Sequence, residues 1–150
     1  MQITQFFLST LLAASAVVAA PTPAETRKSM MAADSQWTIE GLKRVCDKGN
    51  TTCTWTFGID TGSAVQKVKY VVHKSGDTGA NDANGGPSTF GDFTITSGWS
   101  GQFGPGNGFT TLSVVDNKLK EIIYPAYTDA QLAGGKVVTP DQSYTPAALP

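Results

Sequence analysis

Residues 53–60 read CTWTFGID, and this stretch determines the fold class of the chain. Large side chains alternate with small or polar ones along its length. Successive side chains of an extended backbone point to opposite faces, so one face carries Cys53, Trp55, Phe57 and Ile59. Such an alternation is typical of a β-strand that is buried on one face only.

The same period of two recurs along most of the chain, whereas helical periodicity is nearly absent. Further strands are expected within residues 36–46, 64–74, 90–99, 108–116 and 118–127. A change of phase at Gly41 predicts a β-bulge in the first of these strands. Asp116-Asn117 lies between two apolar runs, as the turn of a hairpin does. We therefore expect an all-β fold, a small antiparallel β-barrel or sandwich of about six to seven strands.

The remaining segments are short. We expect a turn-rich loop without core residues at 75–88, one helical turn closed by Gly134-Gly135 at 128–135, and a last short strand at 136–139. The expected domain organisation is a secretory signal peptide at 1–19, a flexible N-terminal arm at 20–35, a β-domain at 36–140 and an extended or disordered tail at 141–150.

The first residues indicate export from the cell. The run QFFLSTLLAASAVVAA, residues 5–20, is apolar or small nearly throughout, carries no charge, and is too short for a convincing membrane span. A signal peptide that is cleaved after Ala19 explains these features, and a buried N-terminal helix is the alternative. No later segment is apolar over the length that a span needs. The sequence therefore predicts a secreted, extracellular protein without a membrane span.

The two cysteines, Cys46 and Cys53, enclose a Lys-Gly-Asn turn within the stretch VCDKGNTTCTW, residues 45–55. In an oxidising compartment and with no other cysteine in the chain, they are expected to form a disulfide with each other. The bond would close a short loop between two strands and stabilise the fold by about 2–3 kcal/mol. The same loop carries an N-glycosylation sequon, which makes Asn50 a candidate acceptor.

Charge and ligand chemistry exclude several classes of protein. The net charge is −1, only 15% of the residues are charged, and both signs are interspersed, so nothing resembles a nucleic-acid-binding stripe. Two cysteines and the single His73 fall short of a zinc ligand set. Calcium is left as an alternative by the loop oxygens of Asp77, Asn81, Asp82 and Asn84, although their spacing is not that of an EF-hand. We expect no metal and no cofactor.

One motif points to an enzyme. Within FGIDTGSA, residues 57–64, Asp60-Thr-Gly-Ser matches the local signature of pepsin-like aspartic proteases, and a second Asp-Thr-Gly begins at Asp77. Such an enzyme needs two carboxylates about 3 Å apart. Copies that start only 17 positions apart do not belong to two lobes. The simpler interpretation is that each motif forms a turn with glycine at positive φ. An aspartic protease that uses Asp60 stays as an alternative to a protein without catalytic residues.

The best candidate for a binding surface is TSGWSGQFGPGNGF, residues 96–109. Its aromatic residues, Trp99, Phe103 and Phe109, are separated by Gly, Ser and Pro, which indicates a loop. Exposed aromatic side chains on loops are enriched at binding sites, and an indole such as that of Trp99 stacks readily on a sugar ring. In the alternative interpretation Trp99 enters the core and Phe109 begins a strand.

Two segments carry a family resemblance. WTIEGLKRVCDKGNTTCTWTFGID, residues 37–60, and YPAYTDAQLAGGKVVTPDQSYTP, residues 124–146, are similar to the hypersensitive-response-inducing protein elicitors of plant-pathogenic filamentous fungi. The resemblance covers roughly residues 36–146. It implies an antiparallel β-barrel with one disulfide and an apoplastic protein that plants perceive, and it brings no catalytic residue. A more distant likeness is to Alt-a-type fungal allergens, whose disulfide-linked dimer would need a cysteine that this chain lacks.

The expected function follows from secretion, the small β-domain and the resemblance. We expect a secreted fungal effector or elicitor that induces plant cell death and defence by binding and not by catalysis. Its partner would be a plant apoplastic or cell-surface protein or a cell-wall glycan, and the protein itself a monomer. The alternatives are the aspartic protease with Asp60 and a cell-wall glycan-binding module with Trp99.

Overall fold

A computed structural model describes residues 35–150 of the protein. The signal peptide at 1–19 and the N-terminal arm at 20–35, except its last residue, therefore lie outside the described residues. Between residues 35 and 150 no helix is long and apolar enough to cross a membrane.

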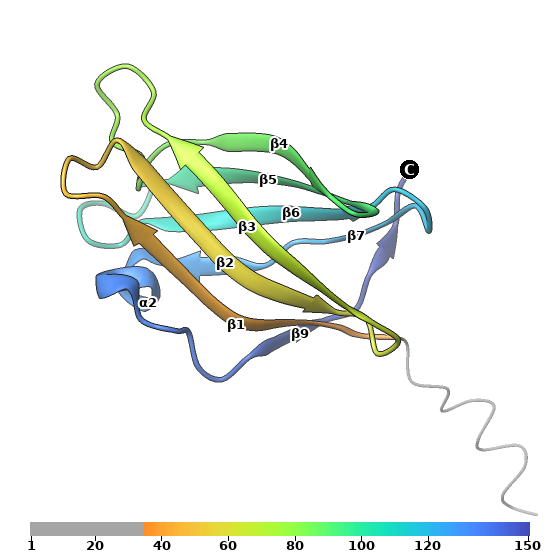
Figure 1. Ribbon diagram of the computed structural model, residues 1–150. Coiled ribbons are helices and arrows are strands. Elements are labelled where there is room, and N and C mark those ends of the chain that lie inside the picture. Colours follow the sequence, from red (N-terminus) through yellow and green to blue (C-terminus); the bar gives the residue numbers. More distant parts are fainter. Residues whose placement is uncertain (1–34) are drawn as a thin grey trace, which may run out of the picture. The chain divides into compact units, whose positions relative to one another are not determined.

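The ten strands of residues 35–150 form two antiparallel sheets (Figure 1). In spatial order the first sheet contains β3 (Val65–His73), β2 (Thr52–Asp60), β1 (Trp37–Cys46) and β9 (Gln142–Tyr144). The second contains β10 (Ala147–Ala148), β7 (Glu121–Ile123), β6 (Phe109–Asp116), β5 (Phe93–Ser100) and β4 (Gly85–Phe90), with β8 (Ala126–Thr128) also paired to β6. The predicted all-β antiparallel fold is confirmed as a sandwich, with more strands than expected. In this part of the chain the strands do not close into the barrel that the resemblance implied.

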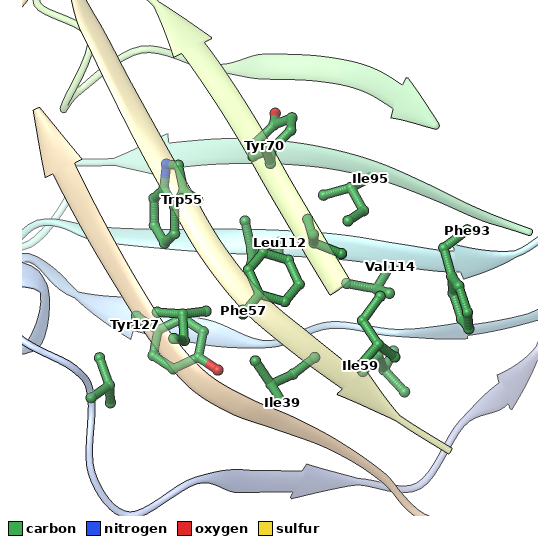
Figure 2. Packing of buried hydrophobic residues seen from close by; sticks show 14 of the residues in the cluster. Ile39, Trp55, Phe57, Ile59, Tyr70, Phe93, Ile95, Leu112, Val114 and Tyr127 are labelled. Atoms are coloured by element: carbon green, nitrogen blue, oxygen red, sulfur yellow. The ribbon is translucent and has the colours of Figure 1, made fainter. Parts of the chain in front are cut away.

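The core lies between the two sheets, and the alternation within residues 53–60 supplies part of one wall. Trp55, Phe57 and Ile59 of β2 are at most 4% exposed, and they face buried aliphatic side chains of β5 and β6 (Figure 2). Burying a side chain of this size stabilises the fold by about 1.5–3 kcal/mol. A second link between the sheets is the edge-on contact of Trp37 with Phe93, whose ring centroids are 5.6 Å apart.

The predicted bulge in β1 is confirmed. The pairing of β1 with β2 shifts between Glu40 and Lys43, and Gly41 has a φ of 57°. The inward-facing positions are odd-numbered before the bulge and even-numbered after it. The bulge therefore turns Arg44 toward the interior, where its side chain is only 7% exposed.

The predicted disulfide is also confirmed. Cys46 and Cys53 lie directly opposite each other at the ends of β1 and β2, and they are bonded. The bond closes the loop that contains Asn50, so the β1–β2 connection is covalently fixed. The expected hairpin around Asp116-Asn117 forms as well, with β6 and β7 paired on either side of it.

Three local predictions were wrong. Residues 136–139 do not form a strand; Val138 is instead buried, and its backbone N–H donates to the carbonyl of Leu42 over 2.7 Å. Residues 118–127 do not form one strand, because Pro125, which has no N–H, separates β7 from β8. Residues 75–88 are not free of core residues, since Ala83 belongs to the core and β4 begins at Gly85.

The C-terminal part completes both sheets. The expected helical turn is α2 (Asp129–Leu132), which begins with a capping box between Thr128 and Gln131 and runs into η1 (Ala133–Gly135). Beyond it, β9 pairs with β1 and β10 pairs with β7. The last ten residues, placed outside the β-domain from sequence, thus contribute one edge strand to each sheet.

Candidate functional site

The structure brings two of the three predicted binding residues together. The rings of Phe103 and Phe109 lie with centroids 5.8 Å apart and planes tilted by 32°. Phe103 belongs to the β5–β6 loop and is 65% exposed, the most exposed of the large apolar side chains between residues 35 and 150. Beside the two rings lies a shallow cavity of about 290 Å³, which Asn107, Ala126 and Thr128 help to line. We call this cavity and its two rings the aromatic cleft.

Trp99, the third predicted residue, has a different environment. Its indole Nε1 donates to Oδ2 of Asp129 over 3.0 Å, and its backbone N–H donates to Oδ1 of Asn84 over 2.9 Å. The ring lies so close to Gly101 and Gly108 that a Cβ at either glycine would come within 3.0 Å of it. Trp99 therefore holds the two ends of the β5–β6 loop in place, and the loop in turn presents Phe103.

A partly buried ion pair between Arg44 and Asp129 supports this arrangement. Both terminal nitrogens of the Arg44 guanidinium lie 3.5 Å from Oδ1 of Asp129, and Nη1 donates to the carbonyl of Asn81 over 2.9 Å. The guanidinium also stacks over Trp55, 5.5 Å from the ring centroid. Asp129 is thus the junction between the core-facing arginine and the loop-facing tryptophan.

A polar cavity of about 450 Å³ lies between Trp99, Asp129 and the glycines of the β5–β6 loop. Asp82 also lines it, and partial burial, followed by the charge of Asp129, raises the pKa of the Asp82 carboxyl. The cavity thus carries two acidic side chains beside one indole edge. Its rim is the same β5–β6 loop that carries Phe103.

Asn50, the predicted glycosylation acceptor, is half-buried, and its side chain is hydrogen-bonded to Asn81. Its Nδ2 donates to Oδ1 of Asn81, and its Oδ1 accepts from the backbone N–H of Asn81 over 3.0 Å. Its carbonyl accepts from the N–H of Ala80 over 2.8 Å. The Nδ2 atom also lies against the backbone of Gly79. Asn50 therefore joins the disulfide loop to the segment between β3 and β4.

The two Asp-Thr-Gly motifs lie at opposite ends of the β2–β3 hairpin. Asp60 ends β2 and accepts a hydrogen bond from the N–H of Gly62 over 2.8 Å, as in an Asx-turn. Asp77 lies in an exposed turn after β3, between Ser75 and Thr78. The nine residues of β3 separate the two ends by roughly 27 Å. Asp60 and Asp77 therefore do not form a carboxylate pair.

Two of the four side chains considered for calcium have protein partners for their oxygen atoms. Oδ1 of Asn84 accepts from Trp99, and Oδ1 of Asn81 accepts from Asn50. His73 is exposed, with its Nδ1 3.4 Å from the hydroxyl of Thr52. Within residues 35–150 no group of three or more His, Cys, Asp or Glu side chains is placed to hold a metal ion.

Reasoning from the sequence missed Arg44 and Asp129 as members of this region. The alternation of Trp37 and Ile39, continued unchanged along the strand, places Arg44 on the outer face. Only the bulge at Gly41 shifts the inward positions to even numbers and turns Arg44 inward. Asp129 had one usable signal, its position in the first turn of a short helix, where an acidic residue is common. Nothing local indicated that it would meet Trp99 from a strand 30 residues earlier.

These features define a small disulfide-bonded β-sandwich protein with an aromatic cleft on its surface and a fixed loop beside it. The comparisons with known proteins agree with that class. The family model for Effector TSP1 matches residues 38–149, which is most of the described sandwich. The chain is also 59% identical, over 151 residues and the full length of both chains, to Effector TSP1 of Hypocrea virens. The chain belongs to the Effector TSP1 family of fungal effectors, as the resemblance indicated.

Proposed function

We propose that the protein is a secreted effector that acts in the host apoplast, where plant tissue perceives it and responds with cell death and defence. It acts by binding and not by catalysis. The observation that carries this proposal is the aromatic cleft. Two phenylalanine rings, one of them 65% exposed, lie side by side where the β5–β6 loop meets β6, and Trp99 and the partly buried Arg44–Asp129 pair hold that loop in position.

Aromatic side chains contribute much of the binding energy in recognition when a partner covers them. A fixed loop also lowers the entropy that binding would otherwise cost. The cleft therefore has the chemistry and rigidity of a recognition surface. The partner that it fits is a plant cell-surface or apoplastic protein or a cell-wall glycan.

No observation at Asp60 supports an aspartic protease, and no observation at Trp99 supports a glycan-binding module centred on that residue. Asp60 holds a turn at the far end of β2 from Asp77. The indole N–H of Trp99 is bound to Asp129, and part of the ring lies against glycine backbone. A glycan that meets this protein would have to use neighbouring surface instead.

The direct test is infiltration of leaves with the purified secreted protein at a series of concentrations, beside the same protein after heat denaturation. We expect local cell death and induction of defence markers that the denatured sample does not produce. Equal responses to both samples, or no response to either, would show that the folded protein is not perceived.

A further inference from the structure

The two outer faces of the sandwich differ in chemistry. The outward side chains of the four-stranded sheet include Glu40, Lys43, Lys67 and Lys69. On β5, β6 and β8 of the other sheet, the outward positions carry no charge. Six of them are hydroxyl residues, which we call the hydroxyl face: Thr94, Thr96, Ser100, Thr111, Ser113 and Thr128.

The strand pairing arranges these hydroxyls as a flat grid. Thr96 lies directly opposite Ser113, and Gly98 lies opposite Thr111. Side chains paired in this way are about 5 Å apart. A Cβ at Gly98 would meet nothing closer than 3.9 Å, so the grid has an open space at its centre. The four residues belong to interior strands, and the hydrogen bonds of the sheet therefore fix their spacing.

The hydroxyl face runs into the aromatic cleft. Phe109 is the first outward residue of β6, two positions from Thr111, and it is paired with Ser100 on one side and Thr128 on the other. Thr128 also lines the cleft. Three of the hydroxyls already bond within the protein: Thr94 to Asn117, Ser100 to the N–H of Gln102, and Thr128 to Gln131. The surface thus offers the hydroxyls of Thr96, Thr111 and Ser113 to a ligand, with two rings tilted by 32° at one end.

We propose that this surface binds a neutral polysaccharide chain. The proposal rests on the proposed function and names the class of partner for the same cleft. Each Ser or Thr hydroxyl donates and accepts, as the hydroxyls of a sugar do, so the two surfaces complement each other without any charge. Phenyl rings provide apolar area for the C–H faces of a sugar. Polyanionic glycans and nucleic acids would require cations, which this face lacks.

The experiment measures retention of the secreted protein on three insoluble polysaccharides, chitin, cellulose and β-1,3-glucan. Thr96→Glu places a charge in the middle of the hydroxyl face. Thr54→Glu is the matched control, because Thr54 is also a half-exposed threonine on an interior strand but points outward from the other sheet. Phe103→Ala, a change in an exposed loop side chain, tests the cleft without disturbing a strand.

We expect the wild type to be retained on at least one polysaccharide, and equally well in about 1 M salt, where charge interactions are screened within about 3 Å. Thr96→Glu and Phe103→Ala should each lower retention by about tenfold or more, and Thr54→Glu should not. Thermal melts of all variants identify any loss of retention that comes from unfolding. If Thr96→Glu does not fold, the retention of Phe103→Ala tests the proposal.

Three results would overturn the proposal: no retention of the wild type on any of the polysaccharides, equal retention of all folded variants, or retention that salt abolishes. A sedimentation coefficient that falls with Thr96→Glu and not with Thr54→Glu would assign the face to a second copy of the chain, and would overturn it too. Leaf infiltration is scored separately, so a protein that elicits a response without binding polysaccharide refutes only this inference.

Discussion

The indole Nε1 of Trp99 donates a hydrogen bond to Oδ2 of Asp129 over 3.0 Å, while Oδ1 of the same carboxylate faces the buried guanidinium of Arg44. One acidic side chain thereby connects the β5–β6 loop, α2 and the bulged strand β1. The aromatic cleft depends on this connection, because the loop that carries Phe103 is fixed at Trp99.

Replacement of Asp129 tests the connection. Asp129→Ala leaves the Arg44 guanidinium with the Asn81 carbonyl and the Trp55 ring but without a carboxylate, and it removes the acceptor of the Trp99 indole. Asp129 is 26% exposed, and water will compensate in part, so we expect a loss of about 2 kcal/mol in the free energy of unfolding in urea. Asp77→Ala, in an exposed turn, should cost less than about 0.5 kcal/mol. Equal losses from the two variants would contradict the role of Asp129.

Two strand glycines predict opposite outcomes. A Cβ at Gly85 would lie 2.4 Å from the hydroxyl of Tyr70 and 2.7 Å from Cγ2 of Val72, both in the core. Gly85→Ala should therefore destabilise the fold by about 2–3 kcal/mol. Gly98→Ala meets no close atom and should be neutral or slightly stabilising. Thermal melts compare the two variants, and a tolerated Gly85→Ala would disprove the close packing of β4 against β3.

The Asn50 amide is expected to carry no glycan in the folded protein, since its nitrogen is bound to Asn81 and lies against Gly79. Mass spectrometry of the secreted chain before and after endoglycosidase treatment should give the same mass. A mass difference that maps to this site would contradict the expectation.

The same geometry gives a stability prediction at this position. Asn50→Asp removes the nitrogen donor and should lower the free energy of unfolding by about 1–2 kcal/mol. Thr52→Ala removes the sequon but keeps the Asn50 bonds, and it should cost clearly less. If the two substitutions cost the same, the bonds of Asn50 do not fix the disulfide loop.

Three tyrosines predict a loss of stability in alkali. Burial is the main cause that raises the pKa values of Tyr70, Tyr127 and Tyr144 above the ordinary value of 10.0. Below pH 10 both the folded and the unfolded chain keep these hydroxyls protonated, so their full contribution is present. Above pH 10 the unfolded chain ionises first, and stability falls by up to about 1.4 kcal/mol per pH unit for each group.

Urea titrations at pH 9 to 11 measure this fall. Tyr127→Phe should make the loss above pH 10 shallower, because it removes one of the three ionising groups. Tyr124→Phe is the control, since Tyr124 is 60% exposed, and its loss should match that of the wild type. Identical profiles for all three proteins would show that Tyr127 does not couple to folding.

The extent to which the sequence predicts this structure differs between local and distant features. Alternation in residues 53–60 and the phase change at Gly41 are local signals, and both were interpreted correctly. The edge strands β9 and β10 were missed because pairs and triplets of residues between prolines carry no periodicity. They form because β1 and β7 present unpaired backbone edges to the returning chain.

In the candidate site, too, the features that one segment encodes were predicted, and those that depend on distant segments were not. The pattern of residues 96–109 indicated the aromatic loop, and Phe103 and Phe109 do meet. The structural role of Trp99 depends on Asp129 and on two glycines against its ring, which lie together only after the sheet has formed. Likewise, the uncharged outer face of β5 and β6 depends on strand pairing, and no single segment of the sequence reveals it.

The most direct test of the central claim, that the protein acts through its aromatic cleft, is a dose–response comparison in infiltrated leaves. Phe103→Ala is compared with Leu119→Ala, because Leu119 is similarly exposed, at 58%, but lies beyond the other end of β6. We predict that Phe103→Ala needs at least about tenfold more protein for the same cell death, while Leu119→Ala matches the wild type. Superimposable curves for all three folded proteins would contradict the claim.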